Sequence, residues 1–219
     1  AGCDSYGKAT PGVLEILDIS KCTIVSGGRS YYKSYRTFDN KVSDYMFYKC
    51  KVLTNLILPD NLTTIDECAF ADCERLSVIA IPNDVVSFGQ QAFLNCISLL
   101  RIPMPNRLTS IGNMAFSGCN SITEISIPAS VSYLGGGIVK NCQNIERINV
   151  EPKNTNFASK DGVLYTSTLD ELLIYPVAHD GENYQVLESA YRIAPFAFVN
   201  AKKLKHLTLQ SVKMPLLVV

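Results

Sequence analysis

The stretch "LTNLILPDNLTTIDECAFADCER", residues 53–75, is followed by three more copies of the same pattern without a gap. The copies are "LSVIAIPNDVVSFGQQAFLNCIS" at 76–98, "LLRIPMPNRLTSIGNMAFSGCNS" at 99–121 and "ITEISIPASVSYLGGGIVKNCQN" at 122–144. Two slots recur at a constant step of 23 residues: Phe47, Phe70, Phe93, Phe116 and Val139, and Cys50, Cys73, Cys96, Cys119 and Cys142. A fixed period of roughly 20 to 50 residues indicates a solenoid, in which each repeat forms one coil.

Each part of the repeat, LxxIxIPxxVxxIGxxAFxxCxx, has a physical role. The segment LxxIxIP alternates inward apolar and outward residues, which predicts a short strand that ends at the proline. The segment xxVxxI turns the chain, and GxxAFxxC predicts a tight turn followed by one or two helical turns. A single coil has no second layer to cover its apolar side chains. Because burial stabilises by roughly 1.5–3 kcal/mol per large side chain, coils are expected to stack with their strands parallel.

On these repeats the sequence resembles the BspA-like leucine-rich-repeat family, in the 23-residue class also called the Treponema pallidum type. The resemblance implies an α/β solenoid, right-handed, with a parallel β-sheet on the concave face and short helical turns and loops on the convex face. It also implies a surface or secreted protein, typical of anaerobic bacteria and some protists. Members of this family bind host matrix proteins or other cells and catalyse no reaction.

The repeat predicts one leucine-rich-repeat domain over residues 13–219, after a polar, flexible N-terminal tether at 1–12. The distance from Ile19 to Leu58 is 39 residues, which is 16 more than one repeat and predicts an insertion at about 25–41. After Val150 the period breaks, and two apolar runs around a polar turn predict a β-hairpin at about 152–184. The register resumes at Val186. The final "MPLLVV", 214–219, either adds a strand or leads into further repeats.

Composition excludes several classes of partner. Lys plus Arg equals Asp plus Glu at 20 each, so no net field favours nucleic acid. No apolar run reaches the roughly 18 residues of a membrane span. The opening Ala1-Gly2-Cys3 resembles the end of a bacterial lipobox, which makes Cys3 a candidate lipidation site; alternatively, the sequence happens to start there. We therefore expect an extracellular or outer-surface protein, with membrane contact only through a lipid anchor at Cys3.

Five of the eight cysteines occupy one repeat slot. Adjacent slots would lie about 5 Å apart, which is compatible with a disulfide, but a row of inward thiols suits packing better than bridging. The constant step of 23 residues also excludes the short paired spacings of a zinc site. We expect free, buried thiols and no bound metal.

The insertion at 25–41 is the first candidate recognition element. It contains Tyr31, Tyr32, Tyr35 and Arg36, and Tyr and Arg are common in protein-binding hot spots and on carbohydrate-binding platforms. The alternative is that the rings cap the open end of the solenoid, which every repeat protein must cover.

A second candidate lies on the outward strand positions. Arg101, Glu124 and Arg147 fall on successive repeats, which predicts a plus-minus-plus row across adjacent strands. Such cross-strand pairs contribute about 0.2–1 kcal/mol each, and the row is either a self-satisfied surface or a site for a polar partner. Pro103, two residues after Arg101, removes one backbone donor from the sheet.

The sequence predicts no catalytic, cofactor-binding or metal-binding residues. Its two histidines, His179 and His206, have no Cys, Ser or acidic partner at a matching repeat position, and no nucleophile-elbow, zinc-protease, dinucleotide or calcium motif is present. The predicted function is non-enzymatic binding of a protein, or of a glycan, on a host or neighbouring cell. The alternative is a structural stalk of a lipoprotein that has no ligand of its own.

Overall fold

The chain forms parallel β-strands in which each repeat lies beside the next, as the 23-residue period predicts. A computed structural model describes residues 2–3, 9–10 and 12–210. These residues divide into two compact units: unit 1 is Ala1–Ile122 with Tyr133–Cys142, and unit 2 is Thr123–Ser132 with Gln143–Val219. The single domain expected over residues 13–219 stays a prediction.

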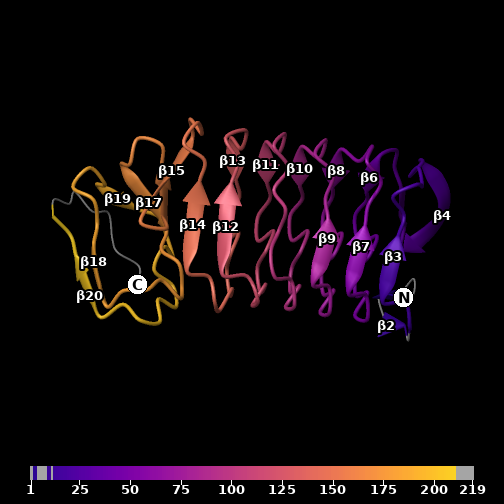
Figure 1. Cartoon of the computed structure of the whole chain (residues 1–219), viewed down its shortest axis with the longest axis horizontal. Helices are drawn as coiled ribbons and strands as arrows, with labels where there is room; N and C mark the ends of the chain where they lie inside the picture. Colours follow the sequence, from indigo (N-terminus) through magenta and orange to yellow (C-terminus); the bar gives the residue numbers. More distant parts are fainter. Residues whose placement is uncertain (1, 4–8, 11, 211–219) are drawn as a thin grey trace. The chain divides into compact units, whose positions relative to one another are not determined.

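The LxxIxI segments of unit 1 form a parallel sheet of three strands, ordered β3 (Ile16–Asp18), β7 (Asn55–Ile57) and β9 (Val78–Ala80) (Figure 1). Ile16 pairs with Asn55, and Asn55 pairs with Val78. The first step spans 39 residues and the second 23, so 16 more residues separate the first two strands than the next two. The following repeat has no strand at 100–105, where Pro103 removes a backbone donor.

The second set of strands in unit 1 comes from the "xxI" positions of each repeat. Five two-residue strands run parallel in the order β13-β11-β10-β8-β6. They are β6 (Lys41–Val42), β8 (Thr64–Ile65), β10 (Ser87–Phe88), β11 (Ser110–Ile111) and β13 (Tyr133–Leu134). The coils that carry β3, β7 and β9 are therefore joined along two separate lines of strand pairing, and the later coils of unit 1 along the second line.

Stacked phenylalanines fill the interior of unit 1. The rings of Phe47 and Phe70 are 5.2 Å apart, those of Phe70 and Phe93 5.2 Å, and those of Phe93 and Phe116 5.8 Å, with interplanar angles of 6°, 16° and 29°. Phe70, Phe93 and Phe116 are fully buried. The ring spacing approaches the distance between neighbouring strands, so each coil covers the ring of the one before it.

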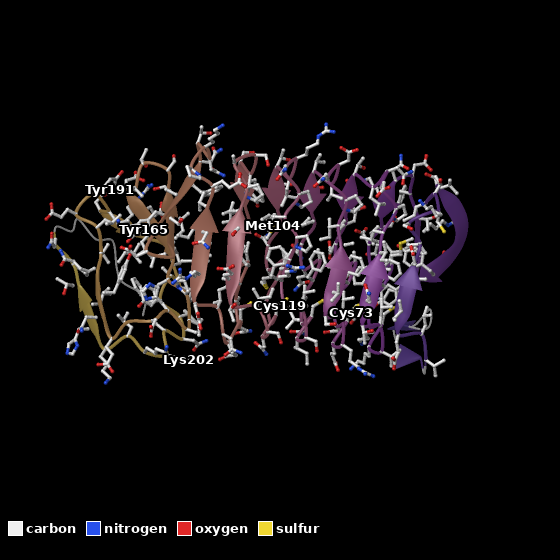
Figure 2. All side chains as sticks on the ribbon, viewed as in Figure 1. Cys73, Met104, Cys119, Tyr165, Tyr191 and Lys202 are labelled. Atoms are coloured by element: carbon white, nitrogen blue, oxygen red, sulfur yellow. The ribbon has the colours of Figure 1, made fainter. Side chains whose placement is uncertain are left out.

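The cysteine slot follows the phenylalanine slot by three residues, and Figure 2 labels two of its members, Cys73 and Cys119. None of the seven cysteines whose side chains the structure describes forms a disulfide, and six of them, including Cys73, Cys96 and Cys119, are buried. Burial raises the pKa of the Cys96 thiol, and it raises the pKa of Cys142 to about 11. The prediction of free, buried thiols is confirmed for this slot, whereas Cys22, outside the slot, is exposed.

The predicted helical turns are absent from the described part of the chain, which contains only strands, turns and bends. Left-handed backbone recurs there every fourth residue, at Cys68 and Asp72 in one coil and at Gln91 and Asn95 in the next. A helix needs an unbroken run of right-handed residues, so none forms. The hydrogen bonds that a helix would keep internal go between coils instead, as from Phe70 N to Ala92 O at 2.8 Å.

Glycine is required where neighbouring coils touch through their backbones. A Cβ on Gly112 would lie 2.6 Å from Gln90 N, and one on Gly135 would lie 2.3 Å from Asn113 N. Both distances are well inside van der Waals contact, so these two coils need glycine here for space, although the same slot holds Asp66 earlier in the chain.

Unit 2 begins with a parallel pair, β12 (Glu124–Ile127) and β14 (Arg147–Val150). A four-stranded sheet follows, ordered β15 (Phe157–Lys160), β16 (Val163–Thr166), β17 (Glu171–Ile174) and β19 (Arg192–Ile193). β16 is antiparallel to both β15 and β17, so the hairpin predicted from the two apolar runs is present and gains a third strand. β18 (Asn183–Gln185) pairs in parallel with β20 (His206–Thr208).

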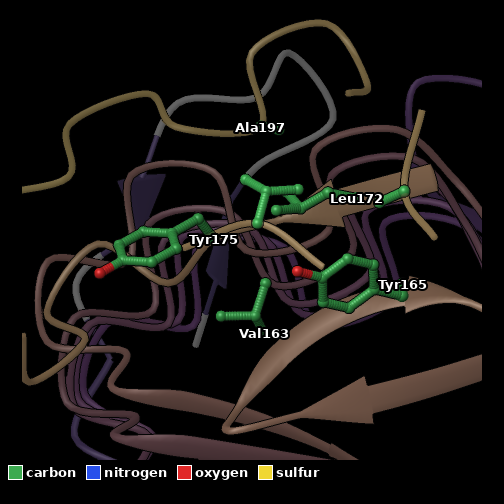
Figure 3. Packing of buried hydrophobic residues seen from close by; sticks show 7 residues of the cluster. Val163, Tyr165, Leu172, Tyr175 and Ala197 are labelled. Atoms are coloured by element: carbon green, nitrogen blue, oxygen red, sulfur yellow. The ribbon is translucent and has the colours of Figure 1, made fainter. Parts of the chain in front are cut away.

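The interior of unit 2 is built around the hairpin. Val163, Tyr165, Leu172 and Tyr175 are buried and pack with Ala197 (Figure 3). The hairpin side chains therefore belong to the core of this unit.

Buried Asn154 holds the segment between β14 and β15 in place. Its Nδ2 donates to the carbonyls of Pro128 and Val131 at 2.8 and 2.9 Å, and its Oδ1 accepts from the backbone N–H groups of Asn156 and Phe157. One side chain thus joins three parts of unit 2.

The predicted tether at 1–12 falls mostly outside the described residues. Within it, β1 (Gly2–Cys3) pairs antiparallel with β2 (Ala9–Thr10). The "MPLLVV" segment at 214–219 also lies outside the described residues.

Candidate functional site

The outward face of the β3-β7-β9 sheet is the first candidate surface. Alternation along each strand sends Leu56 and Ile79 inward, where they are buried, and leaves two outward rows. The register defines these rows as Ile16, Asn55 and Val78, and Asp18, Ile57 and Ala80. The side chains of Ile16 and Val78 are 62% and 51% exposed. This face is largely aliphatic and stands on a hydrogen-bonded sheet.

In the next repeat of unit 1 the 23-residue step places Arg101 at the position of Val78, and Leu100 at the position of Ser77. Leu100 is 63% exposed, and its N–H points to the carbonyl of Ser77, the residue before β9. Arg101 follows it on the segment without a strand, with its side chain exposed. We name the exposed side chains of Ile16, Val78 and Leu100 the aliphatic surface.

The corresponding outward positions in unit 2 are polar. Glu124 pairs in register with Arg147, and Ser126 with Asn149. Glu124 and Arg147 are exposed, and neither takes part in an ion pair with a described residue. The turn at Gly162 also packs against Arg147, because a Cβ on that glycine would lie 2.7 Å from Arg147 Cβ.

The structure therefore brings together two members of the predicted charged row, Glu124 and Arg147, in unit 2. Arg101 belongs to unit 1. A polar partner for Arg101, Glu124 and Arg147 stays a prediction.

The insertion forms a β-hairpin of β4 (Gly27–Tyr32) and β5 (Tyr35–Thr37) in unit 1. The ring of Tyr32 contacts Tyr35, Tyr45 and Tyr48, with centroids 6.1, 4.8 and 5.4 Å away. Tyr32 is only 7% exposed. Its ring therefore offers little surface to a ligand, and its packing is what the capping alternative predicts.

Tyr31 and Tyr35 are half-buried, and Arg36 is exposed. The Tyr31 hydroxyl donates to the carbonyl of Asp44 at 2.5 Å, and burial raises the pKa of this phenol. Tyr31 is thus tied to the coil below the hairpin. Among the four predicted contact residues of the insertion, Tyr35 and Arg36 keep the most freedom to meet a partner.

His179 is a histidine of unit 2 whose two ring nitrogens both have hydrogen-bond partners. Its Nε2 is 2.9 Å from the carbonyl of Asp161, and its Nδ1 is 3.1 Å from the Tyr175 hydroxyl. A carbonyl only accepts, so Nε2 carries the proton and Nδ1 accepts from the phenol. Among the hydrogen bonds of the described residues, no carboxylate, thiol or serine hydroxyl forms a catalytic pair with this ring. The two hydrogen bonds of His179 instead hold its turn against Asp161 and Tyr175.

The described residues offer neither a metal site nor a membrane-spanning helix. No cluster of three or more His, Cys, Asp or Glu side chains could hold a metal ion there. No helix in that part of the chain has the length and apolarity of a membrane span. Nothing is described for the side chain of Cys3, so its lipidation stays a prediction.

Sequence reasoning overlooked the aliphatic surface. Strand alternation puts Val78 at an outward position, but only charged and aromatic residues were predicted as contacts. The sequence did carry a signal for this surface, because "LEILDIS" and "LSVIAIP" have β-branched residues at outward as well as inward strand positions.

One family profile, described as "BspA type Leucine rich repeat region", matches residues 40–161 in six copies. No curated protein matches the chain.

Solved structures of bacterial proteins share the fold. The pneumococcal vaccine antigen PcpA matches with a TM-score of 0.72 and 22% identity over 89% of this chain and 55% of its own. A leucine-rich repeat protein from Eubacterium ventriosum gives 0.65 and 22%, over 78% of this chain and 54% of its own. The T. pallidum leucine rich repeat protein gives 0.51 and 24%, over 79% and 64%. The chain thus spans between 54% and 64% of the length of these three structures.

Proposed function

Because the chain belongs to the BspA-type leucine-rich-repeat family, we propose that it is a non-enzymatic interaction module displayed outside the cell, which binds a protein through the aliphatic surface of unit 1. The observation that carries this proposal is the exposure of Ile16 and Val78 in one row of a hydrogen-bonded sheet. Exposed aliphatic side chains on a rigid strand lose little conformational freedom on binding. Full burial of such a side chain from water contributes roughly 1.5–3 kcal/mol, and covering the 62% and 51% that Ile16 and Val78 still expose contributes a corresponding part of it.

A protein partner fits this surface better than a glycan does. Ile16, Val78 and Leu100 bring no hydroxyl, amide or aromatic ring to the surface, and the half-buried Asn55 between Ile16 and Val78 is the one amide of that row, whereas sugars are held by several such groups. Aliphatic side chains gain from apolar contacts of the kind found at the centre of protein interfaces.

Two further observations support the non-enzymatic and extracellular parts of the proposal. Both ring nitrogens of His179 are occupied by Tyr175 and by a backbone carbonyl, so this imidazole is not poised as a base. PcpA is a vaccine antigen, which is consistent with display outside the cell.

The test is a binding screen of the purified chain against a panel of extracellular-matrix proteins and cell-surface glycans. The Ile16→Ser/Val78→Ser double variant removes two outward side chains and is expected to fold but to lose binding. The control is Ile97→Ser, which changes a residue 42% exposed outside these rows. Capture of glycans alone, or equal loss in the control, contradicts the proposal. A chain that binds nothing in the panel favours the stalk.

The Tyr-rich hairpin is tested by Tyr35→Ser. The equivalent change at Tyr32 is unsuitable, because that ring is buried among three others and its loss would disturb packing. If the hairpin also contacts the partner, Tyr35→Ser weakens binding at a temperature where a thermal melt shows that the variant is still folded; some loss of thermal midpoint is expected, because this ring packs on Tyr45.

The anchor at Cys3 is part of the proposal and has its own test. Mass spectrometry of the protein purified from its native cell would show an added lipid on Cys3. An unmodified Cys3 side chain in the mature native protein contradicts the anchor and leaves the binding proposal intact.

A further inference from the structure

The β4–β5 hairpin lies in a segment with no carboxylate. Residues 19–38 contain Lys21, Arg29, Lys33 and Arg36, and neither Asp nor Glu. The next acidic residue along the chain is Asp39, whose carboxylate accepts from the backbone N–H of Ser26 at the base of the hairpin. The whole chain has a formal net charge of zero, so this excess of positive charge is local.

The basic side chains near the hairpin tip are available. Lys33 and Arg36 are exposed, and neither forms an ion pair with any described residue. Elsewhere in unit 1 exposed basic residues do pair with carboxylates of the neighbouring coil: Lys51 with Glu74 at 2.6 Å, and Arg107 with Asp84 at 2.8 Å. Lys33 and Arg36 differ from these because no carboxylate of a described residue lies within ion-pair distance of them.

The hairpin is held in a defined position. The Tyr32 ring packs among Tyr35, Tyr45 and Tyr48 beneath the tip, and Lys33 Nζ lies 5.3 Å from the Tyr32 ring centroid. Lys33 has a φ of 48° in the two-residue turn between the strands, a conformation that glycine adopts more easily. The Lys33 ammonium group is thus held above the packed tyrosine rings. Groups that are already held in place lose less conformational entropy when they bind.

We infer that this hairpin binds an acidic, extended peptide segment of a partner protein, with Lys33 and Arg36 pairing with its carboxylates. The inference rests on the proposed function and names the chemistry of a partner segment. Lys and Arg form charge-assisted hydrogen bonds with carboxylates, which are stronger than neutral ones.

A peptide fits the hairpin better than an anionic glycan for two reasons. Among the described strands β4 pairs only with β5, so its other edge offers backbone N–H and C=O groups to an added strand. A glycan would instead need an open ring face, and the Tyr32 ring is covered by its neighbours and by Lys33.

The test is fluorescence anisotropy with a labelled peptide of alternating Glu and Thr residues, and with the same peptide carrying Gln in place of Glu. We expect saturable binding of the Glu peptide only, weakened by salt because exposed charges are screened. The Lys33→Glu/Arg36→Glu variant should bind at least about ten-fold more weakly. The control, Lys140→Glu/Lys153→Glu, changes two exposed lysines away from the hairpin and the net charge equally, and should bind as the wild type does.

Three results would overturn the inference: no saturable binding of the Glu peptide, equal weakening in the control variant, or binding of a sulfated glycan but not of the peptide. A thermal melt of Lys33→Ala/Arg36→Ala checks that the tip folds without its charges. Failure here is distinguishable from failure of the proposed function. If the chain captures a matrix protein but does not bind the peptide, only the inference about the hairpin is contradicted. If the chain binds the peptide but nothing in the panel, only the role of the aliphatic surface is contradicted.

Discussion

The thiol of Cys96 donates a hydrogen bond to the backbone carbonyl of Phe70, 26 positions earlier, with 3.2 Å between Sγ and O. The same bond recurs along unit 1: Cys73 to Phe47 at 3.0 Å, Cys119 to Phe93 at 3.1 Å and Cys142 to Phe116 at 3.0 Å. The Phe70 carbonyl also accepts the N–H of Cys73 in its own coil, at 3.2 Å. The cysteine slot therefore joins successive coils in addition to filling space.

Replacing Cys96 by Ala should lower the free energy of unfolding by roughly 1–2 kcal/mol, because a buried sulfur and its weak hydrogen bond are both lost. Urea denaturation followed by circular dichroism measures the change. Cys22→Ala is the control, because Cys22 is exposed, and it should stay within about 0.5 kcal/mol of the wild type. Equal effects at the two positions would show that the slot has no structural role.

Gly112→Ala should destabilise unit 1 by about 1–3 kcal/mol, because its new Cβ would lie 2.6 Å from the backbone of the neighbouring coil. Gly136 provides a matched control in the same unit. A Cβ there would meet nothing closer than Asn113 Oδ1 at 3.9 Å, so Gly136→Ala should be neutral or slightly stabilising. Thermal midpoints of the two variants decide the matter, and a tolerated Gly112→Ala would mean that the coils are not in backbone contact.

The repeat period alone predicts most of the core, because each residue in a slot is covered by the same slot of the next coil. The Phe70, Phe93 and Phe116 stack, the free thiols and the parallel strands follow from it and are confirmed. The helical turns were predicted wrongly, since the left-handed positions are held by residues such as Cys68 and Gln91, which give no sign of that conformation in the sequence.

Asn154→Leu should cost unit 2 about 2–4 kcal/mol. The change leaves the carbonyls of Pro128 and Val131 without their side-chain donor, and buried polar groups that lose a partner are costly. Asn156→Ala is the control, because the Asn156 side chain is exposed and only its backbone N–H meets Asn154. Chemical denaturation of both variants gives the comparison. A mild effect at Asn154, equal to that at Asn156, would refute the role of this side chain.

Asp170 should make the stability of its turn depend on pH at the acid end. Hydrogen bonds from Thr166, Thr168 and Tyr191 lower the pKa of this carboxyl to about 2 from an ordinary value of 3.8. A depressed pKa stabilises the folded state above the ordinary value, and the contribution is lost as the pH falls through the folded value. Wild type should therefore melt above Asp170→Asn at pH 6, and the difference should shrink between pH 3.8 and about 2. A difference that is constant over that range would contradict the assignment.

The candidate site was less predictable than the core. Charged and aromatic residues attract attention in a sequence, but exposure decides what a partner can touch, and exposure depends on local packing. Tyr32 looked like a contact residue and is buried by its neighbours, whereas Ile16 and Val78 looked like ordinary strand residues and are exposed. No repeat partner exists for the insertion, so the 23-residue period says nothing about how its rings pack.

A protein partner of this chain should cover the aliphatic surface of unit 1. The most direct test of this proposal is the binding isotherm of the purified chain with a matrix protein captured in the screen, measured for wild type, Ile16→Ser/Val78→Ser and Ile97→Ser. Loss of two covered side chains should weaken binding by about ten-fold or more in the double variant and leave Ile97→Ser unchanged. Equal affinity of all three proteins would contradict the claim.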